Sequence, residues 1–288
     1  MAEMAGNGTP QDLHERIRAE LQVVRDFDAE RESERRIAFL AGYLQQTGLK
    51  GYVLGISGGV DSTVAGRLAQ LACERVRDEG GEATFVAMRL PYHVQADDVD
   101  AKHALEFINP HEVAHVNVGP ATDALWAGLL EGGAAPDPDR YTDFVKGNVK
   151  ARQRMVAQFT VAGARSMLVI GTDQAAEAVV GFYTKFGDGA ADVTPLTGLP
   201  KRRVREIGEY LGAPASLVNK VPTADLESDK PLLADEVALG VFYDHVDDFL
   251  EGIPVPPEAE ETILRWYHRT GHKREMPLSP QTWEERQR

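Results

Sequence analysis

The sequence has 288 residues, 43% of them hydrophobic, which is enough for one large α/β domain with its own core. Its formal net charge of −14 and the lack of a long Lys/Arg block argue against a nucleic-acid partner. Because it has no run of about 18 apolar residues and no apolar stretch in residues 1–10, we expect no membrane span and no secretory signal. Cys73 is the only cysteine, which excludes an internal disulfide and a multi-cysteine zinc site and is typical of a reducing, cytoplasmic setting.

Two helical patterns open the chain, with apolar residues at helical spacing from Leu13 to Val24 and from Ile37 to Leu44. Short apolar runs that alternate with further helical patterns predict strands at residues 52–56, 84–88, 113–118 and 167–170. This alternation favours an α/β fold with a doubly wound, mostly parallel sheet. We expect loops at residues 132–138 and 187–189, and an irregular polar tail after Gly271.

A glycine-rich loop joins the first predicted strand to the next helical pattern. Its residues are Gly55, Ile56, Ser57, Gly58, Gly59, Val60, Asp61 and Ser62. Ligands of an open parallel sheet bind outside the carboxyl ends of its strands, and adjacent glycines let backbone N–H groups approach phosphate oxygens. The following helix adds its positive N-terminal end. The loop therefore predicts a nucleotide site, although a bare Gly-Gly pair is also compatible with a tight turn that a serine caps.

Asp61 would repel phosphate unless a cation lay between them, so it predicts Mg²⁺, which binds one or two carboxylates together with phosphate oxygens. No Lys follows the glycines, so the loop is not of the GxxxxGK[ST] type. It resembles instead the signature of the ATP pyrophosphatase superfamily, whose members cleave ATP between the α and β phosphates and form an adenylated intermediate. The superfamily implies a Rossmann-like, adenine nucleotide alpha hydrolase-like fold, and the loop alone does not choose among its members.

Four further stretches carry a more specific resemblance: residues 147–155, 171–192, 222–236 and 272–274. The longest contains Gly-Thr-Asp-Gln-Ala-Ala-Glu and then Gly-Phe-Tyr-Thr-Lys-Phe-Gly-Asp-Gly. With residues 89–97, they resemble the ammonia-dependent NAD synthetase family over nearly the whole chain, from about residue 12. The first residues and the extreme C-terminus do not follow the family pattern, and the loop carries Val60 at a position where family members vary.

The resemblance implies one domain, with an N-terminal helical segment at residues 1–48 and an α/β core and tail at residues 49–288. It implies a ligase that forms NAD from deamido-NAD, ammonia and ATP through an acyl-adenylate, with release of AMP and pyrophosphate. ATP, the co-substrate, would contact the glycine loop together with Thr172, Lys201 and Thr223. Mg²⁺ would be held by Asp61 and Glu177. Deamido-NAD would contact Arg152, Lys185, Asp192, His272 and Lys273.

Asp188 lies between two glycines and between Lys185 and Asp192, so it could reach the nicotinate end of the substrate. A carboxylate there would attract ammonium and could accept a proton from the attacking nitrogen. We therefore predict Asp188 and Asp61 as the catalytic residues. The alternative is that Asp188 only makes the turn between its two glycines.

The resemblance also implies a homodimer whose dinucleotide site uses both chains. Residues 143–163 are the candidate seam, because they carry more apolar side chains than one face of a surface helix needs: Phe144, Met155, Val156 and Phe159. Polar, proline-bearing stretches at residues 89–97 and 222–236 are candidate closing loops.

Cys73 lies between apolar neighbours in a helical pattern and should be buried rather than nucleophilic.

Two other functions stay open. Another amidating or thiolating member of the superfamily would need cysteines for sulfur transfer or a basic surface for tRNA, and the single cysteine and the acidic charge argue against both. A nucleotide-sensing module of the same fold would not need both metal carboxylates. A glutaminase domain would need more chain and a cysteine nucleophile, so ammonia is the expected nitrogen donor.

Overall fold

Four parallel strands form a sheet in the computed structural model, which describes residues 10–93, 98–134, 142–221, 235–275 and 277–286. The strands are β1 (Gly51–Gly55), β2 (Thr84–Arg89), β3 (Glu112–His115) and β4 (Leu168–Val169), in the spatial order β3-β2-β1-β4. In the central register, Tyr52 of β1 pairs with Phe85 of β2 and with Leu168 of β4. Each predicted strand is therefore confirmed, with every pairing parallel.

The third strand is shorter than predicted, because it ends at His115. The side-chain oxygen of Asn117 accepts hydrogen bonds from the backbone N–H groups of His93 (3.1 Å) and Gly119 (2.8 Å). An Asn that bonds to nearby backbone makes a turn rather than a strand. This turn leads directly into α5 (Gly119–Glu131).

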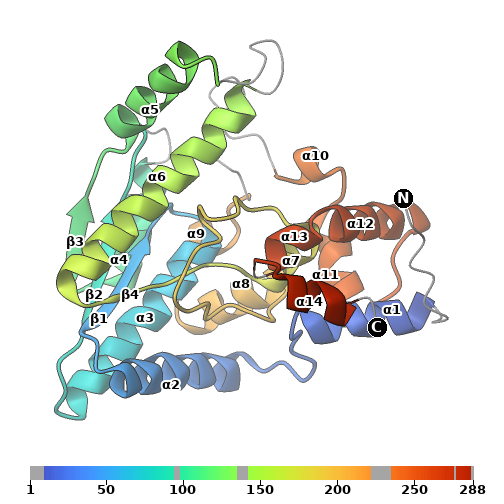
Figure 1. Cartoon of the computed structure of the whole chain (residues 1–288). Coiled ribbons are helices and arrows are strands. Elements are labelled where there is room, and N and C mark those ends of the chain that lie inside the picture. Colours follow the sequence, from blue (N-terminus) through green and yellow to red (C-terminus); the bar gives the residue numbers. More distant parts are fainter. Residues whose placement is uncertain (1–9, 94–97, 135–141, 222–234, 276, 287–288) are drawn as a thin grey trace.

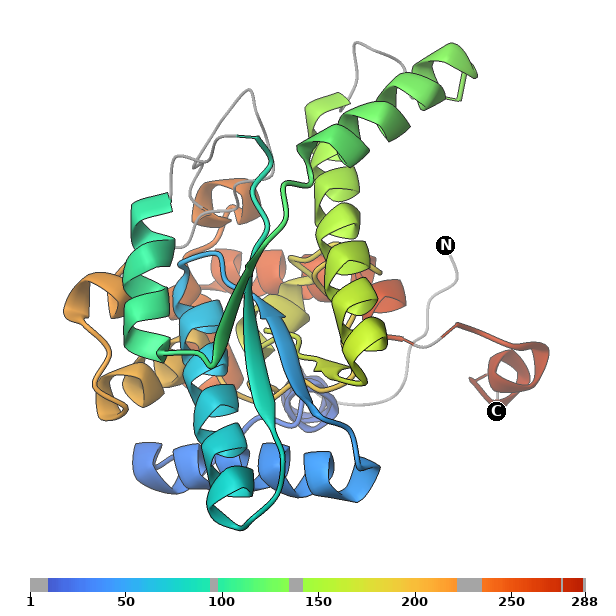
Figure 2. The ribbon, with the colours of Figure 1, turned by 90° about the vertical axis from the view of Figure 1, so that its left-hand side faces the viewer.

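Helices cover both faces of the sheet (Figures 1 and 2). One face packs on α2 (Ala29–Thr47), α3 (Val60–Asp78), α4 (Asp98–Ile108), α8 (Lys201–Tyr210) and α9 (Ala215–Val218), and the other on α6 (Thr142–Arg165) with α5 beside it. Alternate strand residues enter the two cores, so Tyr52 is buried in the first and Val53 in the second. Strands buried on both faces are typical of parallel sheets. The doubly wound α/β fold is confirmed.

A second group of helices has a core of its own. It comprises α1 (Pro10–Glu20), α7 (Ala175–Val180), α10 (Asp235–Leu239), α11 (Tyr243–Glu251) and α12 (Pro257–Arg269). Its fully buried side chains include Ile17, Val180 and Ile263. The division of the chain at residue 48 within one domain stays a prediction. Among the residues that the structure describes, no helix is long and apolar enough to cross a membrane.

The expectation of an irregular tail after Gly271 is wrong, because α13 (Gly271–Arg274) and α14 (Pro280–Arg286) are helical. Lys273 Nζ holds α13 on the body by donating to the carbonyl oxygens of Gly181 (2.8 Å) and Tyr183 (2.7 Å). At α14, the N–H of Thr282 donates to Ser279 Oγ (3.2 Å), a side-chain cap. The partners of Lys273 lie 90 and 92 residues earlier, so the local pattern did not indicate them.

Gly58 in the glycine loop is required by both backbone conformation and space. Its φ is +85°, and a Cβ there would lie 2.7–3.0 Å from backbone atoms of Asp100 and Ala101 in α4. Gly212 has the same φ of +85°, but a Cβ there would meet nothing within 4 Å.

We expect Gly212→Ala to lower the free energy of unfolding by about 1 kcal/mol, the cost of a left-handed backbone at a residue with a side chain. Gly58→Ala should lower it by roughly 2 kcal/mol more, because the backbone of α4 must also shift. Chemical denaturation of the two variants measures the difference. Equal losses would contradict the close approach of α4 as the reason for glycine at position 58.

Candidate active site

A pocket of about 580 Å³ opens at the carboxyl ends of β1, β2 and β4, between the sheet and the second group of helices. Most of the predicted ATP residues line it: Gly55, Ile56, Ser57, Gly59, Val60, Asp61, Ser62, Thr172 and Lys201. Gly58 lies beneath the loop against α4, and Thr223 lies outside the described residues. The structure therefore brings together residues that are far apart in the sequence.

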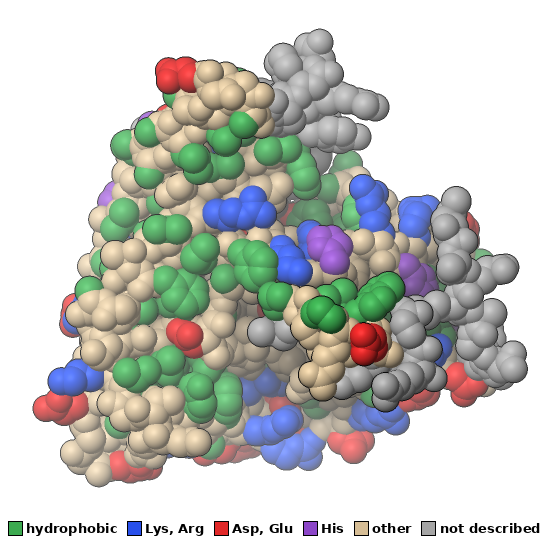
Figure 3. Space-filling model, viewed as in Figure 1, with side chains coloured by type: hydrophobic (Ala, Val, Ile, Leu, Met, Phe, Trp, Pro, Cys, Tyr) green, Lys and Arg blue, Asp and Glu red, His purple; other side chains and the backbone are tan. Residues whose placement is uncertain are grey.

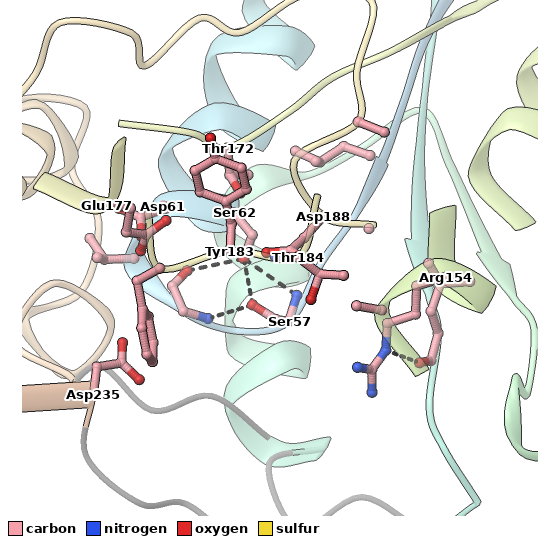
Figure 4. Close-up of a pocket in the computed structure, with 18 of the residues that line it drawn as sticks. Ser57, Asp61, Ser62, Arg154, Thr172, Glu177, Tyr183, Thr184, Asp188 and Asp235 are labelled. Carbon is pink, nitrogen blue, oxygen red and sulfur yellow. Dashed lines mark hydrogen bonds between the residues drawn. The ribbon is translucent and has the colours of Figure 1, made fainter. Parts of the chain in front are cut away.

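The two serines of the glycine loop fold it back on itself (Figure 4). Ser57 Oγ and Ser62 Oγ lie 3.0 Å apart, and Ser62 Oγ donates to the carbonyl oxygen of Gly59 (3.1 Å). The N–H of Gly59 donates to Ser57 Oγ (3.2 Å). Helix α3 begins at Val60 without a side-chain cap, so its first N–H groups are available to an anion. The hydroxyls shape the loop, and the backbone N–H groups at the start of α3 could donate to an anion.

Lys201 joins the two predicted metal ligands, a contact that the sequence did not indicate. Its Nζ lies 2.5 Å from Asp61 Oδ2 and 3.0 Å from Glu177 Oε1, and its side chain is 3% exposed. Burial raises the pKa of Glu177 to about 8, although Lys201 opposes that shift. Burial also disfavours the charge of Lys201, but the two carboxylates hold the pKa of its ammonium well above its ordinary value. The site therefore contains a charged lysine between two carboxyl groups.

Asp61 and Glu177 also fit a magnesium ion. They lie side by side at one end of the pocket (Figure 4), and hard cations prefer carboxylate oxygens. Asp61 Oδ1 is buried and has no hydrogen-bond partner among the described residues, so it is free to ligate a metal ion. Magnesium at this position stays a prediction.

Asp247 of α11 fixes the start of α8 and therefore the backbone of Lys201. Its Oδ1 accepts the N–H of Lys201 (2.8 Å) and its Oδ2 the N–H of Arg202 (2.8 Å). Pro200 precedes them and provides no side-chain cap, so Asp247 replaces a local cap. Burial raises the pKa of Asp247 to about 6. Sequence reasoning missed this residue, because its partners lie 46 and 45 residues away.

Asp188 faces the pocket and also makes a turn. Its Oδ1 accepts the N–H of Thr184 (3.0 Å), and Thr184 Oγ1 in turn donates to Asn148 Oδ1 of α6 (2.7 Å). Burial raises the pKa of Asp188 above its ordinary value, although the Thr184 hydrogen bond opposes this shift. A raised pKa makes a carboxylate a better proton acceptor than an ordinary one. Both expectations for Asp188 therefore stay open.

The residues predicted to bind the dinucleotide are only partly brought together. Lys185 Nζ donates to the carbonyl oxygen of His272, and Arg152 Nη2 donates to the carbonyl oxygen of Lys185 (3.2 Å). Lys273 lines the pocket beside them. Asp192 does not join this group: it is exposed, is not part of the pocket lining and accepts the N–H of Val169 through Oδ2 (2.7 Å). Arg152, Lys185 and His272 are thus linked by hydrogen bonds, and Lys273, next to His272 in the chain, lines the pocket.

Helix α6 forms the opposite wall, with two side chains that the sequence analysis did not assign. Gln158 Oε1 accepts the N–H of Gly55 at the end of β1 (2.7 Å). Arg154 Nε donates to the carbonyl oxygen of Leu90 (3.0 Å), and its guanidinium faces the pocket at the end away from Asp61 (Figure 4). Arg154 lies in a stretch that carries the family resemblance, so that match was the one available signal.

Cys73 is fully buried within α3, as predicted, and burial raises the pKa of its thiol to about 12. A thiol with so high a pKa is almost entirely protonated near neutral pH, and the thiolate is the nucleophilic form. Cys73 is therefore a core residue.

The chain is similar to several known proteins. The family model described as NAD synthase matches residues 32–277. The "NH(3)-dependent NAD(+) synthetase" of Streptomyces coelicolor is 61% identical over 93% of this chain and 97% of its own length. The crystal structure of NAD+ synthetase from Burkholderia pseudomallei is 54% identical, with a TM-score of 0.82 over 94% of this chain and 100% of that one. The structure of NMN synthetase from Francisella tularensis is 35% identical, with a TM-score of 0.76 over 88% of this chain and 99% of that one.

The family model covers most of the sequence, and the strands, the glycine loop and the helices around the pocket all fall within its bounds. The Streptomyces coelicolor protein matches at high identity over nearly the full length of both chains. This chain therefore belongs to the NAD synthase family.

Proposed function

We propose that this chain catalyses the ATP-dependent formation of NAD from deamido-NAD and ammonia. The observation that carries the proposal is the glycine loop, with Asp61, Glu177 and Lys201 beside it, in one pocket with Asp188 and Lys273. This arrangement offers anion donors, metal ligands and a carboxyl group in the same pocket as the basic side chain of Lys273. The 61% identical relative with the same printed activity supports it.

The chemistry needs activation, because a carboxylate has no good leaving group. A nicotinate oxygen attacks the α-phosphorus of ATP, the bond to the β-phosphate oxygen breaks, and pyrophosphate leaves. Ammonia then attacks the carbonyl carbon of the acyl-adenylate, loses a proton, and displaces AMP. The chain supplies no nucleophile in this scheme, so its contribution is orientation and charge stabilisation.

The described residues divide these tasks. The N–H groups at the start of α3 would bind phosphate oxygens. Asp61 and Glu177 would hold Mg²⁺, which when bound neutralises phosphate charge. Lys273 lines the pocket, and Arg152, Lys185 and His272 are linked by hydrogen bonds next to it, so these four residues would bind the dinucleotide. Thr172 lines the pocket at the end of the β4 segment, beside the nucleotide path.

The function is tested by measuring NAD formation with ammonium or glutamine as nitrogen donor. We expect ammonium to support turnover and glutamine to fail, because Cys73 is buried and its thiol is protonated. Cys73→Ala should keep normal turnover with ammonium.

We also infer a cytoplasmic location, since a lone free thiol is typical of reducing compartments.

The carboxylate form of NMN should be assayed beside deamido-NAD, because an NMN synthetase is among the similar structures. We expect deamido-NAD to be preferred by kcat/KM. A preference for the mononucleotide, or efficient use of glutamine, would refute the proposed reaction.

We further propose that Asp188 serves the ammonia step. Asp188→Asn keeps an oxygen that can accept the Thr184 N–H, so the turn should survive, but it removes the proton acceptor. We expect pyrophosphate exchange into ATP to stay within about threefold of wild type and amide formation to fall by about 100-fold, the usual size of a general-base contribution. Asp188→Ala, which also loses the turn contact, is the matched variant. If exchange and amide formation fall together in Asp188→Asn, the residue acts in folding or binding instead.

We also propose a homodimer through the face of α5 and α6. Hydrophobic side chains spread over this face in Figure 3, and Leu125, Leu130, Phe144 and Val156 are 46–56% exposed. Phe144 also lines the pocket, so a partner that covered this face would border the site. Of the apolar residues predicted for the seam, Phe144 and Val156 are exposed, whereas Phe159 packs against the sheet.

Val156→Asp should weaken the dimer by at least about tenfold, because it would place an unpaired carboxylate in the interface. Val99→Asp is the control, since Val99 is 60% exposed on α4, in the layer on the other face of the sheet. Sedimentation velocity over a concentration series measures both variants. A wild-type monomer at micromolar concentration with full activity would argue against the dimer.

A further inference from the structure

Lys201 occupies the position between Asp61 Oδ2 and Glu177 Oε1 that a divalent ion bridging these two oxygens would also occupy. Its ammonium is 2.5 Å from Asp61 Oδ2 and 3.0 Å from Glu177 Oε1. Mg²⁺ contacts its oxygen ligands at about 2.0–2.1 Å. An ion in contact with both of these oxygens would overlap the ammonium or be strongly repelled by it. The two cations therefore exclude each other at this position.

We propose that Lys201 is an exchangeable counter-ion of the metal site. Its ammonium pairs with the carboxyl groups of Asp61 and Glu177 until a divalent ion enters with the nucleotide, and it then moves to the phosphate oxygens. This inference rests on the proposed function, in which ATP brings phosphate and metal into the same pocket. It gives Lys201 a second role, because the residue that binds phosphate also keeps the metal site closed to a free ion.

The surroundings of Lys201 allow its ammonium to move while its backbone stays in place. Asp247 accepts the backbone N–H of Lys201 (2.8 Å) and so fixes the start of α8. The side chain has a flexible four-carbon stem, and its ammonium lies 5.1 Å from the ring centroid of Tyr243. Lys201 and the glycine loop line the same pocket. In the proposed exchange, a rotation of the stem within this pocket moves the ammonium from its carboxyl partners to phosphate partners.

This exchange couples metal binding to nucleotide binding. A divalent ion alone must displace a buried ammonium that would be left without a partner, which is costly. Nucleotide phosphates provide new partners for the ammonium and remove that cost. Because such coupling is reciprocal, the ion should raise the affinity for the nucleotide by the same factor as the nucleotide raises the affinity for the ion.

Binding of Mn²⁺ to the full chain without nucleotide, followed by electron paramagnetic resonance, tests the proposal directly. We expect Lys201→Met to bind Mn²⁺ about tenfold more tightly than wild type, because the carboxylates no longer share a resident cation. Lys146→Met is the matched control: Lys146 Nζ pairs with Asp123 Oδ1 at 3.0 Å and does not line the pocket. Its Mn²⁺ affinity should equal that of wild type.

The tighter Mn²⁺ binding of Lys201→Met must depend on the carboxyl groups of Asp61 and Glu177. In the double variant of Lys201→Met with Asp61→Asn, the added affinity should disappear. Lys201→Gln, which keeps an amide donor, is measured in parallel, and Mn²⁺ should raise its Tm by more than it raises that of wild type. Equal Mn²⁺ affinity in wild type and Lys201→Met would overturn the proposal, as would a gain that survives Asp61→Asn.

The result can be separated from the proposed reaction. Failure of the wild-type chain to form NAD, together with the Mn²⁺ gain, would refute the reaction and leave the exchange of cations standing. Formation of NAD without the Mn²⁺ gain would refute the exchange alone.

Discussion

The pocket depends on the burial of one ammonium group between two carboxyl groups. Asp61 comes from α3, Glu177 from α7 and Lys201 from α8, so three helices meet at this contact. Removing one partner of a buried ion pair leaves an uncompensated charge, which costs several kcal/mol. Helix α3 belongs to the first core and α7 to the second. The contact of Lys201 with both helices therefore holds the sheet layer and the second group of helices together.

The same contact explains how so acidic a chain can bind a polyanion. The net charge of −14 describes the whole molecule, but the pocket combines helix N–H groups and basic side chains at one edge of the sheet. Charges at short range in a partly buried site outweigh distant surface charges, which solvent and salt screen. Asp61 and Glu177 also lie inside the pocket and would repel nucleotide phosphates. Binding of a polyanion there therefore requires a cation between the carboxyl groups and the phosphates.

Features that are contiguous in the sequence could be predicted well. The strands follow from apolar runs, and the glycine loop carries its backbone donors, Asp61 and the helix start within a few residues. Partners that are distant in sequence could not be predicted. Lys201 lies 140 residues from Asp61, and a lysine after a proline has no local sign of such a contact. The family resemblance indicated that Lys201 and Asp61 belong to the site, but not that they bind each other. For Asp192, the family resemblance predicted a contact with the dinucleotide, but its carboxylate instead accepts a backbone N–H of β4.

The contacts of Lys273 have a consequence for how variation is distributed along the chain. Its ammonium binds the carbonyl oxygens of Gly181 and Tyr183 and lies 5.4 Å from the ring centroid of Tyr183, so Lys273 cannot be exchanged for a shorter or neutral residue without losing these contacts. Gly181 is restricted for another reason: its φ is +63° and a Cβ would lie 2.3 Å from the Cβ of Thr270. Neutral drift should therefore be purged at positions 181 and 273 and confined to aromatic residues at position 183, where the ring keeps its contact with the ammonium.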